Sequence, residues 1–164
     1  MKSDWRDLYD YARDPEVSKY LTWSYYESER DAVRYLSYVL PRYKRGEYYD
    51  WALIDRATGK MIGTCGFTSF DLPSNSAEVG YVLTRARWGE ELIPEALRAV
   101  IRFGFISLGL HRIEARYIVG NEKSLRVMQK VGMKYEGVLR DSMFVKGEYV
   151  SVGVAAILRD EFVR

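Results

Sequence analysis

The sequence is poor in the residues that hold small proteins together covalently or through metal ions. Among its 164 residues, Cys65 is the single cysteine and His111 the single histidine. One cysteine excludes an internal disulfide framework, and one cysteine with one histidine leaves no zinc site of the usual kind. We therefore expect no bound metal, a reducing compartment and a fold that depends on its apolar core.

A strong charge of one sign is also absent. Lysine and arginine number 25, and aspartate and glutamate 23, which gives a formal net charge of +2. Such a balance lacks the field that gathers a protein on nucleic acid or on an anionic membrane. No apolar run reaches the roughly 18 residues of a membrane-spanning helix, and the first residues lack the apolar segment of a signal peptide. We expect a cytoplasmic protein whose partner is a small molecule or a local protein surface, not nucleic acid or a membrane.

The length and the periodic patterns predict one domain of mixed structure, residues 1–164. Capping residues and apolar residues at helical spacing predict helices at 5–12, at 14–21, at 28–46, at 94–108 and at 122–131. Short apolar or alternating runs predict strands at 49–54, at 61–70, at 77–83, at 113–119, at 135–145 and at 149–158. This order places hairpins at both ends and a strand, helix, strand unit in the middle. The fold class is therefore α+β, with a single mixed, mostly antiparallel sheet flanked by helices.

The segment 85–98 is typical of a strand end that turns into a helix able to hold an anion. Pro94 suits the first turn of that helix, so backbone N–H groups near Gly89 should be unpaired and directed outward. Such a helix end attracts phosphate. Glu90 and Glu91, however, stand where the phosphate would sit. The direction of these two side chains therefore decides whether the segment binds an anion.

The electrostatic cost of inward-facing glutamates is large enough to matter. A carboxylate about 4 Å from a phosphate charge is repelled by about 1 kcal/mol in water and about 4 kcal/mol at an effective dielectric of 20. The alternative is that both glutamates face outward, where a carboxylate in the first turn favours the helix dipole. Three nearby arginines could neutralise the glutamates or reach the phosphates themselves, namely Arg85, Arg87 and Arg98.

Short motifs occur in a characteristic order along nearly the whole chain. They are Asp14-Pro15-Glu16-Val17 with Tyr20-Leu21, Ala77-Glu78-Val79-Gly80-Tyr81, Trp88-Gly89 followed by Glu95-Ala96-Leu97, Asn121 with Ser124, and Val131-Gly132-Met133 leading to Glu136-Gly137. Together they resemble the GNAT superfamily of acyl-CoA-dependent N-acyltransferases, and more closely its Rim type, the ribosomal-protein N-terminal acetyltransferases and their small-substrate relatives. The resemblance implies splayed third and fourth strands with the acyl-CoA in the cleft between them. It further implies direct transfer of acetyl from acetyl-CoA to a primary amine, either of a protein N-terminus or of a small molecule.

The resemblance also implies which residues contact the cofactor. They are Val82, Leu83, Arg85, Arg87, Trp88, Gly89, Glu90, Glu91, Leu92, Asn121 and Ser124. The family's pyrophosphate loop usually has Gln or Arg, two residues, Gly, one residue, then Gly or Ala, whereas this chain has Ala86, Gly89 and Glu91 there. This departure leaves two alternatives: a non-catalytic GNAT-fold binding module that has lost CoA binding, or an acyltransferase for a bulkier acyl-CoA or a displaced cofactor. Trp88 is either an aromatic wall beside the cofactor or an anchor between turn and core.

N-acylation needs a base for the amine, a donor to the thioester carbonyl and assistance to the thiolate. Glu78 is the candidate base, with a cross-strand ion pair as the alternative, and a backbone N–H in 82–83 is the candidate donor. Many family members carry a tyrosine acid seven residues after the asparagine, but this chain has Met128 there. Ser124 or Asn121 is therefore the candidate at the sulfur, and capping of the following helix is a second role that either could have.

Aromatic residues gather between the first predicted helices. Trp23, Tyr25 and Tyr26, with Tyr20, predict an amphipathic wall for the acceptor. In some ribosomal-protein members a carboxylate in the penultimate strand serves as base. The position aligned with it here is Met143, which disfavours a ribosomal substrate.

The beginning of the chain also departs from the family pattern. Rim-type members normally open with a strand before the first helix, whereas this chain starts at that helix. Either the strand is absent, which would leave an exposed sheet edge that another chain or element could cover, or the natural chain begins upstream of this sequence. We therefore expect a homodimer as a further feature.

Overall fold

The computed structural model describes residues 4–47 and 49–162. Its helices are α1 (Trp5–Ala12), α2 (Pro15–Ser18), α3 (Glu29–Lys44), α4 (Leu92–Ile106), α5 (Glu122–Lys130) and α6 (Arg159–Phe162). Its strands are β1 (Tyr49–Ile54), β2 (Met61–Asp71), β3 (Ser76–Leu83), β4 (Arg112–Ile118), β5 (Lys134–Val145) and β6 (Glu148–Leu158). Every predicted helix and strand is present, and α6 is an addition. Boundaries differ by a few residues: α4 begins at Leu92, before Pro94, and Val119 lies beyond β4.

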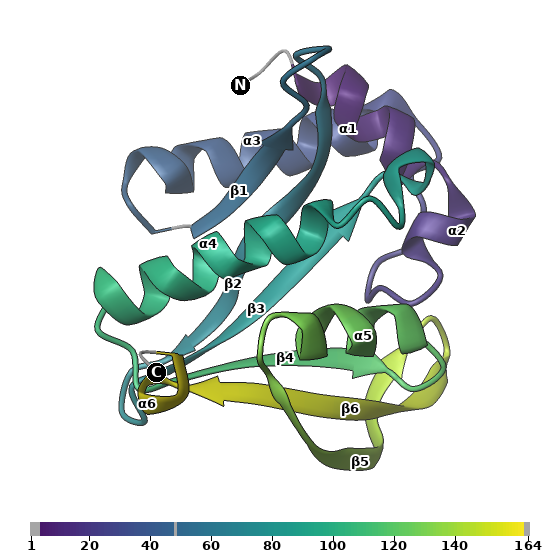
Figure 1. Cartoon of the computed structure of the whole chain (residues 1–164). Helices are drawn as coiled ribbons and strands as arrows, with labels where there is room; N and C mark the ends of the chain where they lie inside the picture. The colour runs from purple at the N-terminus through teal and green to yellow at the C-terminus, as the bar shows by residue number, and fades with distance from the viewer. Residues whose placement is uncertain (1–3, 48, 163–164) are drawn as a thin grey trace.

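Local capping chemistry explains where the N-terminal helices begin. The Asp14 side chain accepts a hydrogen bond from the Glu16 N–H at 3.0 Å, and Pro15 occupies the first helical position of α2. Ser28 and Asp31 form a reciprocal capping box at the start of α3. These short-range contacts place α2 and the loop after it at the carboxyl ends of the central strands (Figure 1).

The six strands form one sheet in the order β1-β2-β3-β4-β6-β5. Only the β3–β4 pair is parallel, and all other neighbours are antiparallel. The parallel pairing runs from Ser76 to Val79 on β3 and from Arg112 to Ala115 on β4, although both strands continue beyond it. The two strands therefore diverge at their carboxyl ends (Figure 1). This confirms the predicted mixed, mostly antiparallel sheet with splayed central strands.

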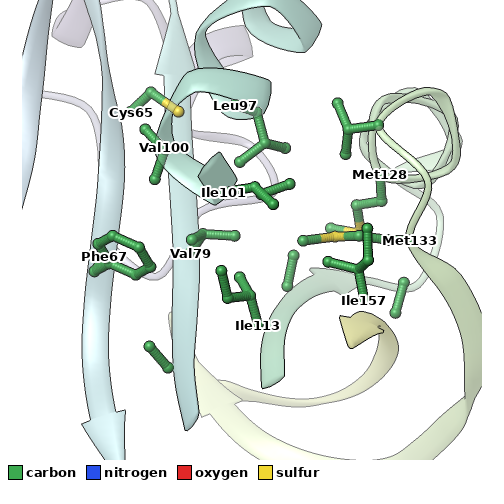
Figure 2. Packing of buried hydrophobic residues seen from close by; sticks show 14 of the residues in the cluster. Cys65, Phe67, Val79, Leu97, Val100, Ile101, Ile113, Met128, Met133 and Ile157 are labelled. Carbon is green, nitrogen blue, oxygen red and sulfur yellow. The ribbon is translucent and has the colours of Figure 1, made fainter. Parts of the chain in front are cut away.

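Apolar side chains form a core on each face of the sheet. The larger core packs α4 and α5 against the central strands, and Leu97, Ile101 and Ile113 in it are fully buried (Figure 2). The smaller core packs α1 and α3 against the other face. Burying a side chain of this size contributes roughly 1.5–3 kcal/mol. Packing against α4 and α5 therefore supports the central strands up to the point where β3 and β4 separate.

In the described part of the chain, β1 forms one edge of the sheet. Residues 4–47 form helices and connecting turns, and among the described strands β1 pairs with β2 alone. Whether this edge is covered by a second chain stays a prediction. In the described part of the chain, no helix combines the length and the apolar character needed to cross a membrane.

Candidate active site

A cleft of about 780 Å³ lies where β3 and β4 separate. Its walls come from the carboxyl-terminal halves of these two strands, from the start of α5, from α2 with the loop after it, and from β5 and β6. Among the residues predicted for the site, the following line the cleft: Glu78, Val82, Leu83, Trp88, Asn121 and Ser124. The sheet thus brings together candidates for the base and for the sulfur contact that lie more than 40 residues apart in sequence.

The register of β3 distinguishes its two candidate backbone donors. The Thr84 N–H donates to the Ile62 carbonyl on the β2 side at 2.7 Å. Successive N–H groups of an antiparallel strand point in opposite directions. The N–H of Val82 therefore points toward β2, and that of Leu83 points toward the diverging β4. Leu83 is the residue of this pair that can donate into the cleft.

Trp88 has the anchoring role that was one of its two alternatives, and its ring also lines the cleft. Its indole Nε1 donates to the Leu83 carbonyl at 2.9 Å, which anchors the turn after β3 to the strand. The ring also lines the cleft, and the Lys123 ammonium of α5 lies 4.5 Å from the ring centroid. Such a cation–π contact contributes about 0.5–1 kcal/mol at an exposed site. A contact of the ring with the cofactor stays a prediction.

The two glutamates that follow Trp88 are paired with cations outside the cleft. Glu90 forms an ion pair with Arg87 at 2.7 Å, and Glu91 forms one with Lys130 at the end of α5. Both carboxylates are well exposed, and neither lines the cleft. Glu91 adopts a left-handed conformation, with φ of 60°, at the N-cap of α4 and makes no side-chain capping bond. The sequence left two alternatives, in which Glu90 and Glu91 face either inward or outward. In the structure both carboxylates face outward.

The three arginines predicted near this loop are engaged by protein groups. Arg85 forms an ion pair with Asp14 at 2.8 Å, and Arg87 bridges Asp55 and Glu90. Arg98 donates to the Lys130 carbonyl at 2.9 Å. Reaching a phosphate would require each arginine to exchange one of these contacts. Two other cationic residues, Lys123 and Arg126 on α5, line the cleft itself.

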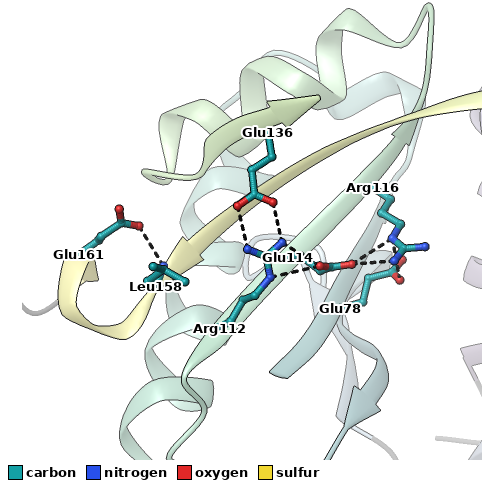
Figure 3. A network of polar contacts seen from close by, with 7 residues as sticks. All are labelled: Glu78, Arg112, Glu114, Arg116, Glu136, Leu158 and Glu161. Carbon is teal, nitrogen blue, oxygen red and sulfur yellow. Dashed lines mark hydrogen bonds and ion pairs between the residues drawn. The ribbon is translucent and has the colours of Figure 1, made fainter. Parts of the chain in front are cut away.

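Glu78 lies at the point where β3 and β4 part. Its side chain is 29% exposed and lines the cleft, and its carboxylate lies 3.6 Å from Arg116 on β4. Burial raises the pKa of Glu78 above its usual value, Arg116 lowers it, and Glu114 raises it. The cross-strand ion pair, the alternative to a catalytic role, is present (Figure 3). The role of Glu78 as base stays a prediction.

Asn121 and Ser124 begin α5 beside the cleft. The Asn121 side chain accepts from the Ser124 N–H at 3.3 Å, so it caps the helix as predicted. The Ser124 hydroxyl lies 2.8 Å from the hydroxyl of Tyr81 on β3. Met128, at the position of the family's tyrosine acid, is 1% exposed and packs in the core. The sequence analysis named Tyr81 only as part of a motif and did not predict this contact.

Of the four aromatics predicted beside the acceptor, Tyr20 lines the cleft, whereas Trp23, Tyr25 and Tyr26 do not. Trp23 packs on Tyr26 with 5.4 Å between ring centroids, within the smaller core. Tyr25 and Tyr26 line a separate hollow with Tyr35 and Tyr38. The acceptor side of the cleft is formed instead by the segment 20–22 and by Met143. A role of the three aromatics in acceptor binding stays a prediction.

Cys65 is buried, and of the two residues in the middle of β5, Met143 and Asp141, the first lines the cleft. Cys65 is 1% exposed, and burial raises the pKa of its thiol to about 12. The thiol is therefore a small apolar group, since only the thiolate is reactive. At the middle of β5, Met143 lines the cleft, whereas Asp141 bonds Ser151 through its backbone N–H at 3.1 Å.

The open mixed sheet with a cleft between splayed parallel strands is the fold of acyl-CoA-dependent N-acyltransferases. Residues 1–134 match the family described as an acetyltransferase (GNAT) domain. The chain belongs to this family and is an acyltransferase.

Two curated relatives illustrate the similarity in sequence. The chain is 33% identical over 155 residues to an uncharacterised N-acetyltransferase, p20, of Bacillus licheniformis, covering 94% of this chain and 87% of that protein. It is 28% identical over 108 residues to a ribosomal protein uS5-alanine N-acetyltransferase of Escherichia coli, covering 65% and 56%. The predicted resemblance to Rim-type enzymes is confirmed.

Solved structures agree with the fold. A GNAT-family acetyltransferase from Bacillus anthracis has a TM-score of 0.85 and 25% identity, covering 98% of this chain and 92% of that one. A spermidine N-acetyltransferase from Vibrio cholerae, solved with CoA and spermine, has a TM-score of 0.82 and 19% identity, covering 100% and 95%. At such low identity, the second structure supports the fold alone.

Proposed function

We propose that this chain transfers an acetyl group directly from acetyl-CoA to a primary amine, which is either a protein N-terminus or a small amine. The observation that carries the proposal is the cleft. It joins the half-buried carboxylate of Glu78, the free strand edge at Leu83 and the hydroxyl of Ser124 in one open space. Family membership supports acetyl-CoA as the donor, because GNAT enzymes use it.

The residues of the cleft fit such a donor chemically. A strand edge offers hydrogen bonds to amides, and Leu83 supplies an N–H there. Lys123 and Arg126 supply positive charge along the same cleft. The loop is not sterically blocked, because a Cβ added at Gly89 would meet no heavy atom within 4 Å. Glu91 remains the departure from the family's pyrophosphate loop. Its carboxylate is paired with Lys130 and does not line the cleft.

Each reacting group has a protein partner in this proposal. Acetyl-CoA, when bound, supplies the thioester whose carbonyl carbon the amine attacks. Glu78 accepts the proton that the amine gives up, and its raised pKa brings it closer to the working pH of a general base. The Leu83 N–H polarises the carbonyl, and the Ser124 hydroxyl donates to the sulfur. Direct transfer needs no covalent intermediate on the enzyme and depends on placing the thioester beside the amine.

Calorimetric titration tests the donor site. We expect acetyl-CoA to bind the wild-type chain with measurable heat and Glu91→Gly to bind it more tightly. No heat with wild type and restored binding with Glu91→Gly would overturn the enzymatic proposal and leave a binding module. A parallel titration with butyryl-CoA and octanoyl-CoA tests the alternative of an acyltransferase for a bulkier acyl-CoA. That alternative requires tighter binding of the bulkier thioesters than of acetyl-CoA.

A panel of amines and peptide N-termini, read by release of the CoA thiol, tests the reaction. With an accepted amine, we expect Glu78→Gln to lower kcat by about 100-fold or more, the range for loss of a general base. Glu122→Gln is the matched control, because it removes a different carboxylate that lines the same cleft. Full turnover by Glu78→Gln would remove Glu78 from the mechanism.

A further inference from the structure

Five charged side chains of alternating sign cross the sheet from β3 to β5 beside the cleft (Figure 3). They are, in spatial order, Glu78, Arg116, Glu114, Arg112 and Glu136. Glu78 is the only one of the five proposed above to take part in the reaction. The other four are therefore candidates for setting its properties.

Arg116 is shared unequally between its two carboxylate neighbours. Its Nε and Nη2 both donate to the same Glu114 oxygen, at 3.0 and 2.9 Å. Its nearest approach to the Glu78 carboxylate, again from Nε, is 3.6 Å, which is beyond hydrogen-bond distance. The Arg116 guanidinium is thus hydrogen-bonded to Glu114. It attracts the Glu78 carboxylate electrostatically but makes no hydrogen bond to it.

Glu114 is well placed to keep Arg116 in this position. It lies beside Glu78 in the parallel register of β3 and β4, and it is two residues from Arg116 on its own strand. Its second carboxylate oxygen accepts from Arg112 at 2.9 Å, and Arg112 is held in turn by two hydrogen bonds to Glu136, at 2.8 and 2.7 Å. The orientation of Glu114 is therefore fixed from both sides.

We propose that Glu114 is a positioning residue that holds Arg116 away from Glu78 and so leaves the Glu78 carboxylate free to accept the proton of the acceptor amine. A bidentate Arg116–Glu78 bond would stabilise the carboxylate and make it a weaker base. The inference rests on the proposed role of Glu78. It adds Glu114 as a residue that contacts neither acetyl-CoA nor the acceptor amine. Glu114 instead sets how strongly Arg116 stabilises the Glu78 carboxylate.

The other charged groups around Glu78 do not change the competition between Glu78 and Glu114 for Arg116. The cleft also contains Glu16 and Lys19 from the α2 side and, from the α5 side, three further charged residues, Glu122, Lys123 and Arg126. The neighbours of Glu78 on β2 are Thr68 and Ser69, which are uncharged. Among the described groups, Arg116 and Glu114 are those whose charges act on the pKa of Glu78, Arg116 lowering it and Glu114 raising it.

A carboxyl-carbon NMR titration of the full chain, without substrate, tests the inference directly. The Glu78 signal is assigned from its loss in Glu78→Gln. We expect Glu114→Gln to lower the pKa of Glu78 by about half a unit or more and Arg116→Gln to raise it by a similar amount. Glu136→Gln is the matched control, because it removes the same charge from the same network but contacts Arg112 instead of Arg116. We expect it to shift the pKa of Glu78 much less.

Opposite signs for the two variants distinguish positioning from general loss of structure. The inference is overturned if Glu114→Gln leaves or raises the pKa of Glu78, or if Glu136→Gln shifts it equally. Should Glu114→Gln fail to fold, Arg116→Gln decides alone, and an unchanged pKa of Glu78 in it overturns the inference.

The pH dependence of kcat/KM separates this inference from the proposed function. Its acidic limb reports the base of the free enzyme, so it should move to lower pH in Glu114→Gln and to higher pH in Arg116→Gln. If the NMR shifts occur while the acidic limb stays in place, Glu114 and Arg116 do set the pKa of Glu78, and the proposed role of Glu78 as base fails instead.

Discussion

The hydroxyl of Tyr81 lies 2.8 Å from the hydroxyl of Ser124 and 3.1 Å from the Ser124 carbonyl oxygen. This contact joins β3 to the first turn of α5 across the cleft. A carbonyl can only accept, so the single Tyr81 proton goes either to that carbonyl or to the serine hydroxyl. In the second arrangement the serine proton is free to point at a sulfur atom in the cleft. Tyr81 therefore controls the direction of the Ser124 proton.

Removing the Tyr81 hydroxyl should slow catalysis through Ser124. We expect Tyr81→Phe, which keeps the ring, to lower kcat by about fivefold, the equivalent of one net hydrogen bond of about 1 kcal/mol. Steady-state rates of both single variants and of Tyr81→Phe with Ser124→Ala complete a double-mutant cycle. If Tyr81 acts through Ser124, it has no further effect once the serine is gone. Fully additive losses would contradict this.

The ion pair between Glu91 and Lys130 should protect the donor site from the glutamate charge. We expect Lys130→Met to weaken acetyl-CoA binding by about threefold and Glu91→Gln to strengthen it, modest effects because the pair is exposed. Both effects should shrink as salt rises from 0.05 to about 0.5 M, since salt screens exposed charges. Lys134→Met, which breaks the pair with Glu161, is the control for loss of one surface lysine. Equal weakening by both lysine variants would argue against a local role for Glu91.

Lys146 should hold the acceptor side of the cleft together. Its ammonium donates to the Ser18 carbonyl at 2.6 Å, which ties the β5–β6 turn to α2, and burial lowers the pKa of its ammonium. The helix α2 lines the cleft, as do Met143 and Val152 of the two strands that the turn connects. We expect Lys146→Met to raise the KM for the acceptor by about tenfold, the lower end of the range for a hydrogen bond from a charged group. Calorimetry should find acetyl-CoA binding nearly unchanged. A larger loss of acetyl-CoA affinity than of acceptor affinity would show that the contact supports the whole cleft.

Asp50 should make the fold less stable as pH rises. Burial raises the pKa of Asp50 to about 7, although hydrogen bonds to Thr64 and Tyr35 lower it, and its Oδ1 lies buried without a hydrogen-bond partner among the described residues. The folded state then holds a proton that the unfolded chain, with a pKa near 3.9, releases. This stabilising contribution is complete below about pH 4 and is lost as pH rises to about 7.

The variant Asp50→Asn isolates that contribution. Three pKa units correspond to at most about 4 kcal/mol, so urea unfolding at pH 8 should give a free energy of unfolding for Asp50→Asn that exceeds wild type by about 2–4 kcal/mol. Near pH 4 the two proteins should be close. A difference that is the same at both pH values would mean that the buried carboxylate is not the cause.

Much of the fold could be predicted from short-range patterns. The alternation of Ala77, Val79 and Leu83 with their polar neighbours predicted β3, and Asp14 ahead of Pro15 predicted α2. These signals act within a few residues, where the physics of capping and amphipathicity operates. Motif order then indicated the GNAT family and so the splayed strands, which periodicity alone could not indicate.

The candidate site was predictable in its residues but not in their relationships. Glu78, Asn121 and Ser124 were named from the sequence, and all three line the cleft. The contact of Ser124 with Tyr81 was missed, because it depends on how β3 and α5 pack at a separation of 43 residues. Tyr25 and Tyr26 were predicted beside the acceptor, and the structure places them in another hollow. Loop residues have no periodic pattern that would fix their direction.

The sequence by itself determined the elements, the family and the identity of the charged groups at the donor loop. It also contained the departure at Glu91, since that follows from motif spacing alone. Only the tertiary structure decided where the charge of Glu91 goes, because its partner Lys130 lies 39 residues away on another helix. The direction of a charged side chain depends on which opposite charge the folded chain brings near it, and that is set by the packing of α4 against α5.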